Sequence, residues 1–521
     1  MIGLEPAAWS GLVPLPVVIP LFAAGLTLAL YRYPRWQRLI TTIALTAVLL
    51  VSVTLLALAD SGPIVVDVGG WVAPVGIPLV ADRLAALMLT VSAIVILCVL
   101  LYSLGQGHAD GDEQAPVAIY HPTYLVLAAG VANTFLAGDL FNMFVGFEIL
   151  LAASFVLLTL GGSRSRIRAG TVYVIVAMVA STLFLVAIGL IYSATGTVNL
   201  AQLAMRLDEI DPSIAIVCEL LLLLAFGVKA AVFPLSAWLP DSYPTAPAPV
   251  TAVFAGLLTK VGVYAILRTE TLLFPGEQLR DLLLVAALAT MVVGILGAIV
   301  QSDLKRLLSF TLVSHIGFML FGIGLGSEAG LAGSVFYVVH HITVQTVLFL
   351  VAGLVERHGG TTSLERLGGL ARLAPFLALL FFVSAMNLAG IPPMSGFLGK
   401  VGLIQAGISS ATPLAWVLVA GSVVTSLLTL YAVSRAWTKA FWQAVPAGDE
   451  PVKLPRGMMW PTAGLVAAMV GITFIAGPLY GYTTRAAADL TARTAYVDSV
   501  LPGDAQDQEL ADPVDAEGGE E

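Results

Sequence analysis

Residues 225–267, AFGVKAAVFPLSAWLPDSYPTAPAPVTAVFAGLLTKVGVYAIL, decide the fold of this chain. The stretch holds two apolar runs, one with Lys229 ahead of Pro234 and the other with Lys260. A proline inside a helix removes one hydrogen bond and frees the carbonyl four residues earlier, here that of Ala230. A charge at the centre of a membrane helix costs roughly 2.5–3.5 kcal/mol on insertion scales. The stretch therefore predicts a broken and a continuous membrane helix, each with a costly lysine.

The composition of the whole chain agrees with a membrane protein. Of its 521 residues 58% are hydrophobic and 11% charged, with a mean hydropathy of +0.95. A soluble domain carries roughly 25% charged residues, so a set of soluble domains is excluded. Strand-type alternation is absent, which excludes a β-barrel. Cys98 and Cys218 lie in apolar runs without a partner at metal or redox spacing, so we expect no metal or other cofactor.

Apolar stretches of about 20 residues, long enough to cross a bilayer, recur along the sequence. We therefore predict an all-α polytopic membrane protein of about fourteen transmembrane helices. The expected spans are 12–30, 39–59, 81–103, 121–138, 140–160, 170–192, 213–233, 248–267, 281–300, 307–325, 331–355, 373–392 continuing to 409, 414–434 and 460–480.

The distribution of charge predicts the orientation. Clusters of basic residues follow spans 1, 5, 9, 11 and 13, all odd-numbered, which places those loops in the cytoplasm and both termini outside the cell membrane. The net charge of −9 comes entirely from nine acidic residues after Arg493, so this tail is expected to be solvated and disordered. The rest of the chain is neutral and gives no electrostatic support to nucleic-acid binding.

Four ionisable side chains lie inside apolar spans. They are Glu148 in span 5, Lys229 in span 7, Lys260 in span 8 and Lys400 in the second half of span 12. Structural ion pairs would explain one such pair, but three lysines outnumber the single carboxylate. We interpret the set as proton- or ion-handling groups, with movement of Glu148 relative to Lys229 switching whether the lysine keeps its proton.

Histidines add further candidates for a relay. His315 lies in span 10, and His340 and His341 lie in span 11. Adjacent residues point about 100° apart on a helix, so we expect one of the last two to face an interior path and favour His341.

Other charges have more ordinary expected roles. Asp82 and Arg83, at the start of span 3, are expected to form an interfacial pair, and Asp139 is expected to lie at the surface or cap a helix. The role of Glu219, near the start of span 7, stays open.

A second helix interruption suggests an internal repeat. Pro392 and Pro393 break span 12 ahead of Lys400, as Pro234 breaks span 7. Lys229 follows Glu148 by 81 residues, and Lys400 follows His315 by 85. We therefore expect two inverted five-helix repeats, spans 4–8 and 9–13. The chain then divides into N-terminal helices 1–3 (1–120), the first repeat (121–267), the second repeat (268–437), a cytoplasmic loop with helix 14 (438–483) and an acidic disordered tail (484–521).

Four stretches carry a resemblance to a known family. GDLFNMFVGFEILLAASF, the stretch quoted first, SDLKRLLSFTLVSHIGF and AGIPPMSGFLGKVGL resemble the proton-translocating antiporter-like subunits of respiratory complex I, membrane-bound hydrogenases and Mrp-type sodium/proton antiporters, and the Mrp members most of all. The resemblance covers most of the chain and implies a fourteen-helix fold with a hydrated central axis.

The resemblance also implies roles for single residues. Glu148, Lys229, Lys260 and Lys400 match the charged positions of the family's spans 5, 7, 8 and 12, and the histidines match relay positions less closely. Gln345 stands where relatives often carry a lysine. The family further implies other hydrophobic partner subunits, protons and possibly sodium as transported ions, and no cofactor in this chain.

Two other functions compete with a cation/proton antiporter subunit. The first is a proton-pumping module of a redox-driven complex, either an NADH:quinone oxidoreductase or a membrane-bound hydrogenase. The second is a scaffold subunit whose charges only hold helices together, and the full set of four buried charges argues against it.

Overall fold

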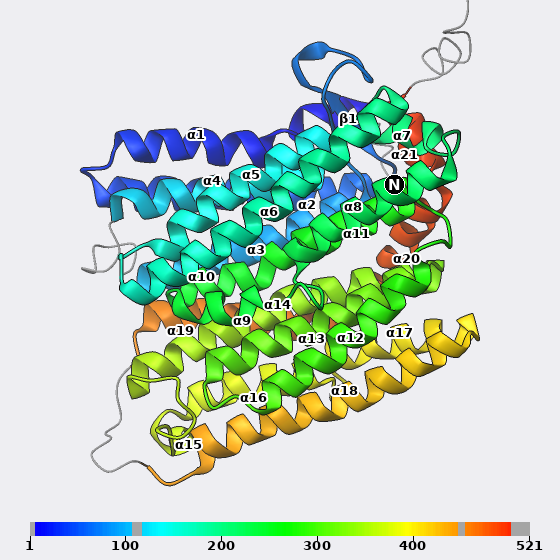
Figure 1. The fold of residues 1–521 in the computed structure, drawn as a ribbon. Coiled ribbons are helices and arrows are strands. Elements are labelled where there is room, and N and C mark those ends of the chain that lie inside the picture. The colour runs from blue at the N-terminus through cyan, green and yellow to red at the C-terminus, as the bar shows by residue number, and fades with distance from the viewer. Residues whose placement is uncertain (1–5, 107–116, 446–453, 502–521) are drawn as a thin grey trace, which may run out of the picture.

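A computed structural model describes residues 6–106, 117–445 and 454–501 of the chain (Figure 1). The described part is mostly helical, and most helices run roughly side by side. Twelve helices in it are long and apolar enough to cross a membrane. The two other expected spans correspond to α4 and to the pair α16 and α17, which are not among the twelve, so the total of fourteen stays a prediction.

The elements follow the predicted spans closely. The N-terminal part contains η1 (Pro6–Leu12), α1 (Leu15–Ala29), α2 (Pro34–Ala59), β1 (Ile64–Asp67), η2 (Val68–Gly70), β2 (Pro78–Ala81) and α3 (Arg83–Gln106). The first expected repeat contains α4 (Val117–Leu136), α5 (Leu140–Thr159), α6 (Arg164–Thr195), α7 (Leu200–Arg206), α8 (Pro212–Ala230), α9 (Trp238–Ser242), η4 (Tyr243–Thr245), α10 (Ala248–Val253), η5 (Phe254–Leu258) and α11 (Thr259–Leu272).

The second expected repeat and the C-terminal part complete the bundle. The former contains α12 (Arg280–Ile299), α13 (Leu304–Gly324), α14 (Glu328–Gly359), α15 (Leu370–Leu373), α16 (Pro375–Ala389), α17 (Ser395–Ser410), α18 (Pro413–Trp437) and η6 (Thr438–Trp442). The latter contains α19 (Arg456–Phe474), α20 (Ala476–Ala492) and α21 (Thr494–Val500).

Burial separates central from peripheral helices. The most apolar windows of α14 and of the continuous segment α10–α11 are 100% buried, and that of α13 is 94% buried. The windows of α2, α18 and α19 are each only 33% buried. A helix that is apolar all round belongs in the interior, whereas one with an open apolar face can meet lipid or a partner. The polar groups carried by α11, α13 and α14 therefore lie in the core.

Two isolated backbone bridges recur at a fixed interval. Asp139 pairs with Asn199, and Asp303 pairs with Ser363, so both partners of the second bridge follow those of the first by 164 residues. Each aspartate also caps the helix that follows it, α5 or α13. This confirms the expected capping role of Asp139. The recurrence is the pattern that an internal repeat predicts.

Both expected helix interruptions are present. The first is a non-helical segment of several residues and not merely one missing hydrogen bond. Helix α8 ends at Ala230 because Ala231 adopts a left-handed conformation (φ 59°), and α9 begins only at Trp238. Helix α16 ends at Ala389, followed by left-handed Gly390 (φ 86°), and α17 begins at Ser395. The breaks thus start before the prolines.

Three features depart from the sequence expectations. The segment before α3 pairs β1 with β2 in an antiparallel hairpin, which the prediction of helical spans did not include. Span 8 contains a π-helical turn, η5, directly before Lys260. The disordered tail expected from residue 484 is wrong for residues 484–500, which complete α20 and form α21, because their apolar side chains pack on the bundle. Residues 502–521 lie outside the described part.

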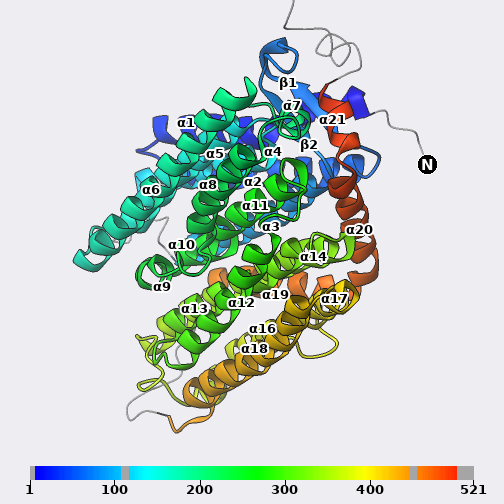
Figure 2. The same ribbon diagram turned by 45° about the vertical axis from the view of Figure 1, so that its right-hand side comes forward.

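Helix α20 runs across the other helices at one end of the bundle (Figure 2). It packs against α14 of the second expected repeat and also touches α3 and α11. Helix α20 therefore connects both halves of the molecule.

Candidate functional site

The seven ionisable side chains predicted from the sequence come from six helices, α5, α8, α11, α13, α14 and α17. Lys260, His315, His340 and His341 are fully buried, and Lys400 is 5% exposed. Glu148 and Lys229 are partly buried. Because ionisable groups are expensive at membrane depth, each needs a hydrogen-bond partner, a hydrated path or a function.

Lys229 ends α8 and contacts neutral groups in the structure. Its Nζ donates to Ser181 Oγ at 2.8 Å and lies 5.0 Å from the centre of the Phe147 ring. Among the described residues it forms no ion pair with Glu148, whose Oε1 is buried without a hydrogen-bond partner there. The structure therefore shows no direct ion pair between the two groups, and the switch between them stays a prediction.

A small cavity of about 30 Å³ adjoins Lys229. Phe147, Tyr173, Trp238 and Tyr243 contribute to its walls. One water needs roughly 10–15 Å³ of such volume, so the cavity has room for a water beside the lysine. Residues on both sides of the break between α8 and α9 line this space, and Trp238 donates across the break from Nε1 to Val228 O at 3.1 Å.

Lys260 is placed by the π-helical turn η5. Its Nζ donates to Ala255 O at 2.5 Å, within that turn. A π-turn shifts the backbone pairing of a helix and is frequent at functional sites. The turn therefore gives the buried ammonium group an acceptor inside its own helix.

Lys400 lies against the second interruption. Its Nζ donates to Ala389 O at 2.9 Å and to Leu388 O at 3.3 Å, the last carbonyls of α16. It also lies 5.0 Å from the centre of the Phe318 ring. A cation is favourable at a helix C-terminus because the last carbonyls carry partial negative charge. The broken helix thus supplies the stabilisation that a carboxylate would otherwise provide.

The histidines form two separate contacts. His315 and His341 stack with ring centres 5.2 Å apart, and His315 Nδ1 lies 2.7 Å from the Tyr337 hydroxyl. His340 Nδ1 instead lies 3.0 Å from Ser395 Oγ, at the start of α17. Both ring nitrogens of His341 are buried without a hydrogen-bond partner among the described residues. The structure brings His341 to His315 and His340 to the α16–α17 break, and both residues stay candidates.

Gln345 lies one turn beyond His341 on α14. Its Nε2 donates to Leu308 O at 2.8 Å, while its Oε1 is buried without a hydrogen-bond partner among the described residues. A carboxamide does not titrate, so it cannot carry a proton as a lysine does. Proton transfer past this point must use other groups.

Several polar partners in the site could not be found from the sequence. Ser181, Tyr337 and Ser395 hold a lysine or a histidine, but hydroxyl side chains are common in membrane helices and carry no distinctive spacing. Their assignment required the three-dimensional packing.

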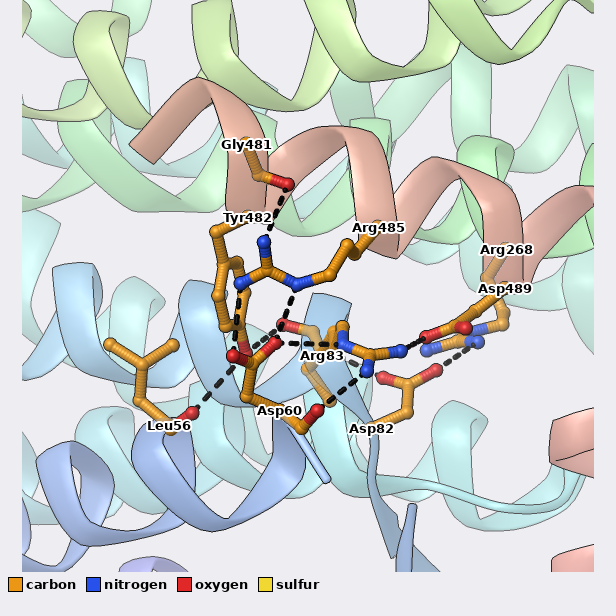
Figure 3. Close-up of polar contacts among 10 residues, drawn as sticks. Leu56, Asp60, Asp82, Arg83, Arg268, Gly481, Tyr482, Arg485 and Asp489 are labelled. Atoms are coloured by element: carbon orange, nitrogen blue, oxygen red, sulfur yellow. Dashed lines mark hydrogen bonds and ion pairs between the residues drawn. The ribbon is translucent and has the colours of Figure 1, made fainter. Parts of the chain in front are cut away.

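A second group of charged side chains is separate from the seven described above. Arg268 on α11 forms a buried ion pair with Asp82, at 2.7 Å, and Arg83 bonds instead to Asp60 and Asp489 (Figure 3). The expected pair of Asp82 with Arg83 is therefore wrong, because the two neighbours turn toward different helices. Glu219 is buried in α8, and its charge acts on Glu270 of α11.

The fold and the site together define a family of membrane proteins. Residues 137–429, more than half of the chain, match the family model described as "NADH:quinone oxidoreductase/Mrp antiporter, TM". The chain belongs to this family and is a multi-pass membrane protein, which confirms the resemblance expected from the sequence.

Individual relatives extend the similarity over almost the whole chain. It is 39% identical to the D subunit of the Na(+)/H(+) antiporter of Alkalihalophilus pseudofirmus, over 94% of this chain and 99% of that protein. The corresponding D subunit of Bacillus subtilis is 35% identical over the same shares.

Solved structures share the fold. A chain of the Mrp complex from Dietzia sp. is 32% identical with a TM-score of 0.88, and a chain of an archaeal membrane-bound sulfane sulfur reductase is 27% identical with a TM-score of 0.87. Each match covers 94% of this chain and 99% of the other.

Proposed function

We propose that this chain is the proton-translocating D subunit of a multi-subunit sodium/proton antiporter of the Mrp type. The names of its relatives and its similarity to a chain of an Mrp complex support this assignment. The chain then acts as a secondary transporter subunit rather than as an enzyme. Its partners are the other hydrophobic subunits of the complex, which couple proton movement to the efflux of a monovalent cation in the cell membrane.

One observation carries the proposal. Buried amine and imidazole groups from both expected repeats lie on helices that pack on one another, with neutral rather than anionic partners. A lysine whose partners are neutral can release its proton without leaving a buried carboxylate unpaired. In this mechanism Glu148 and Lys229 form the first exchange site, Lys260 and the histidines connect the two repeats, and Lys400 is the terminal carrier.

The repeats and the orientation belong to the same proposal. Two bridges at a constant interval and two broken helices support inverted units, spans 4–8 and 9–13. The α1–α2 and α5–α6 connections and α15 lie at one end of the bundle, opposite α7, α20 and α21 (Figure 1). Basic residues concentrate at the first end, which supports a cytoplasmic location there and termini on the outer side.

A redox-driven proton pump is the second candidate. The similarity to a chain of the sulfane sulfur reductase, described as an archaeal respiratory membrane complex, favours it. The same lysines would move protons there, but electron transfer in partner subunits would drive them.

Purification of the tagged chain in mild detergent, followed by mass spectrometry, separates the two candidates. The antiporter assignment predicts small hydrophobic partners without cofactors, and sodium-dependent pH changes in vesicles that contain the complex. Recovery of flavin- or iron–sulfur-containing partners would contradict the antiporter assignment and identify the chain as a subunit of a redox-driven proton pump.

A further inference from the structure

Six charged side chains meet where α2, α3, α11 and α20 come together (Figure 3). We call them the arginine–aspartate cluster: Asp60, Asp82, Arg83, Arg268, Arg485 and Asp489. Three carboxylates face three guanidinium groups, so the formal charges cancel. Most of the cluster is partly exposed; the side chains of Asp60 and Asp489 are 39% and 30% exposed.

The Arg268–Asp82 pair differs from the rest because it is buried. Its side chains are only 3% and 8% exposed, and the shortest N–O distance is 2.7 Å. The guanidinium group of Arg268 also lies over the rings of Tyr264 and Tyr496, at 5.4 and 5.1 Å. Replacing a buried ion pair by apolar side chains is often neutral or stabilising, so a fold does not need this pair for stability alone.

The pair is joined to Lys260 along one helix. Lys260, Tyr264 and Arg268 follow one another at intervals of four residues in α11, which places them on successive turns of one face. Arg268 Nη2 donates to the Tyr264 hydroxyl at 3.2 Å, and that hydroxyl donates to Phe135 O at 2.6 Å. Eight residues of helix correspond to about 12 Å between the two cationic positions.

The residues of α11 between Lys260 and Arg268 are buried, so the interaction between charges at these two positions is poorly screened. Two unit charges about 12 Å apart at an effective dielectric constant of about 20 change a proton equilibrium by the order of one pH unit. Asp82 compensates Arg268 and removes this effect. Loss of the carboxylate charge would expose Lys260 to the full repulsion of the guanidinium group.

We propose that Arg268 and Asp82 are positioning residues for proton exchange at Lys260, which they serve by keeping a permanent charge on α11 compensated. The inference rests on the proposed function, since it requires Lys260 to exchange a proton during transport. Neither residue carries that proton. Arginine stays charged, and the carboxylate of Asp82 is bonded to Arg268.

Other ionisable groups lie near Lys260 and near the Arg268–Asp82 pair. All of them stay unchanged in the variants considered below. His315 on α13 and His341 on α14 interact electrostatically with Lys260. Tyr482 on α20 donates to Arg83 O, beside Asp82, and the ring of Tyr496 on α21 lies under the guanidinium group of Arg268. A change confined to the Arg268–Asp82 pair therefore isolates the effect of its charge.

The test compares pH profiles of sodium/proton antiport for the assembled complex carrying Asp82→Asn, Arg268→Gln or both. Asp82→Asn is expected to move the profile to lower pH by about one unit, because an uncompensated positive charge disfavours the protonated lysine. Arg268→Gln leaves a negative charge and is expected to move it to higher pH. The double variant removes both charges and is expected to restore the original profile.

Two further variants separate charge from packing. Asp489→Asn removes a carboxylate from the same cluster, but one bonded to Arg83 rather than to Arg268, and is expected to leave the profile unchanged. Arg268→Lys keeps the charge with fewer donors and is expected to keep the profile even if stability falls. It also provides the test if a neutral variant fails to assemble.

Shifts in the same direction for both single variants, failure of the double variant to restore the profile, or a shift in Arg268→Lys as large as in Arg268→Gln would overturn the inference. Transport that persists without Lys260 would instead contradict the proposed function itself. The two failures are thus distinguishable.

Discussion

At the scale of single residues, the site depends on cations held by neutral acceptors. Lys260 and Lys400 each donate to carbonyls at a helix irregularity, and Lys229 donates to a serine hydroxyl. None of the ion pairs among the described residues includes these three lysines. Each lysine can therefore lose its proton and, as a neutral amine, still donate a hydrogen bond to the same neutral oxygen.

Glu148→Ala is expected to abolish sodium-dependent proton movement while the complex still assembles, because the proposed switch needs a charge near Lys229. Transport is measured as a pH change in vesicles, and assembly by co-purification. Glu277→Ala serves as the control, since Glu277 is 83% exposed and forms only a local ion pair with Arg280. Normal transport by Glu148→Ala would contradict the switch.

Among the histidines, His341→Ala is expected to reduce transport more than His340→Ala. His341 stacks on His315, whereas His340 bonds to Ser395 at the edge of a helix break. Initial rates from both variants at equal protein levels measure the difference. A larger loss in His340→Ala would assign the relay to the α16–α17 break instead.

At this scale the sequence predicts only those site residues whose types are rare in membrane helices. Lysine, glutamate and histidine are conspicuous in apolar spans because burying them is expensive. Ser181 and Tyr337 are equally close to the charges, but their residue types occur throughout such spans. The wrong pairing of Asp82 with Arg83 has the same origin, since adjacent residues in a chain can face different helices.

At the scale of elements, two interruptions and a π-turn place the lysines. Proline and glycine made the two breaks predictable, although each break begins before its proline. The π-turn before Lys260 left no mark in the apolar sequence, because it changes the pairing of backbone groups rather than the residue types.

Gly390→Ala is expected to lower both stability and transport. Gly390 has φ 86°, where a residue with a Cβ costs about 1–2 kcal/mol, and the added Cβ would lie 3.0 Å from Lys400 Cδ. Thermal unfolding of the complex and vesicle transport measure the two effects. The control Gly464→Ala lies within α19 with open space around it and is expected to be neutral or slightly stabilising. Equal behaviour of the two variants would contradict this role for the break.

At the scale of the whole molecule, α20 ties the first and last parts of the chain together. Arg485 on α20 bonds to Asp60 at the end of α2, at 2.9 Å. Burial alone would raise the pKa of Asp60, but hydrogen bonds from Arg485 and Arg83 hold that pKa below its usual value. The folded state therefore favours the ionised carboxylate more than the unfolded state does.

Asp60→Asn is consequently expected to lower the melting temperature of the complex near neutral pH. The difference from the unaltered protein should persist above about pH 4, the usual pKa of aspartate, and shrink as the pH falls further, because Asp60 then becomes protonated in both states. Melting curves at several pH values measure it. A difference that grows on acidification would contradict the sign of the effect.

Proton exchange at Lys260 is the proposed connection between the two halves of the molecule. The most direct test is sodium-dependent proton movement in vesicles containing the complex with Lys260→Ala, compared with Lys305→Ala, a similarly buried lysine that is paired with Glu356 outside the proposed relay. We predict that Lys260→Ala assembles normally but loses transport by roughly 100-fold or more, the scale of a lost proton-transfer group, while Lys305→Ala keeps it. Undiminished transport by Lys260→Ala would contradict this connection.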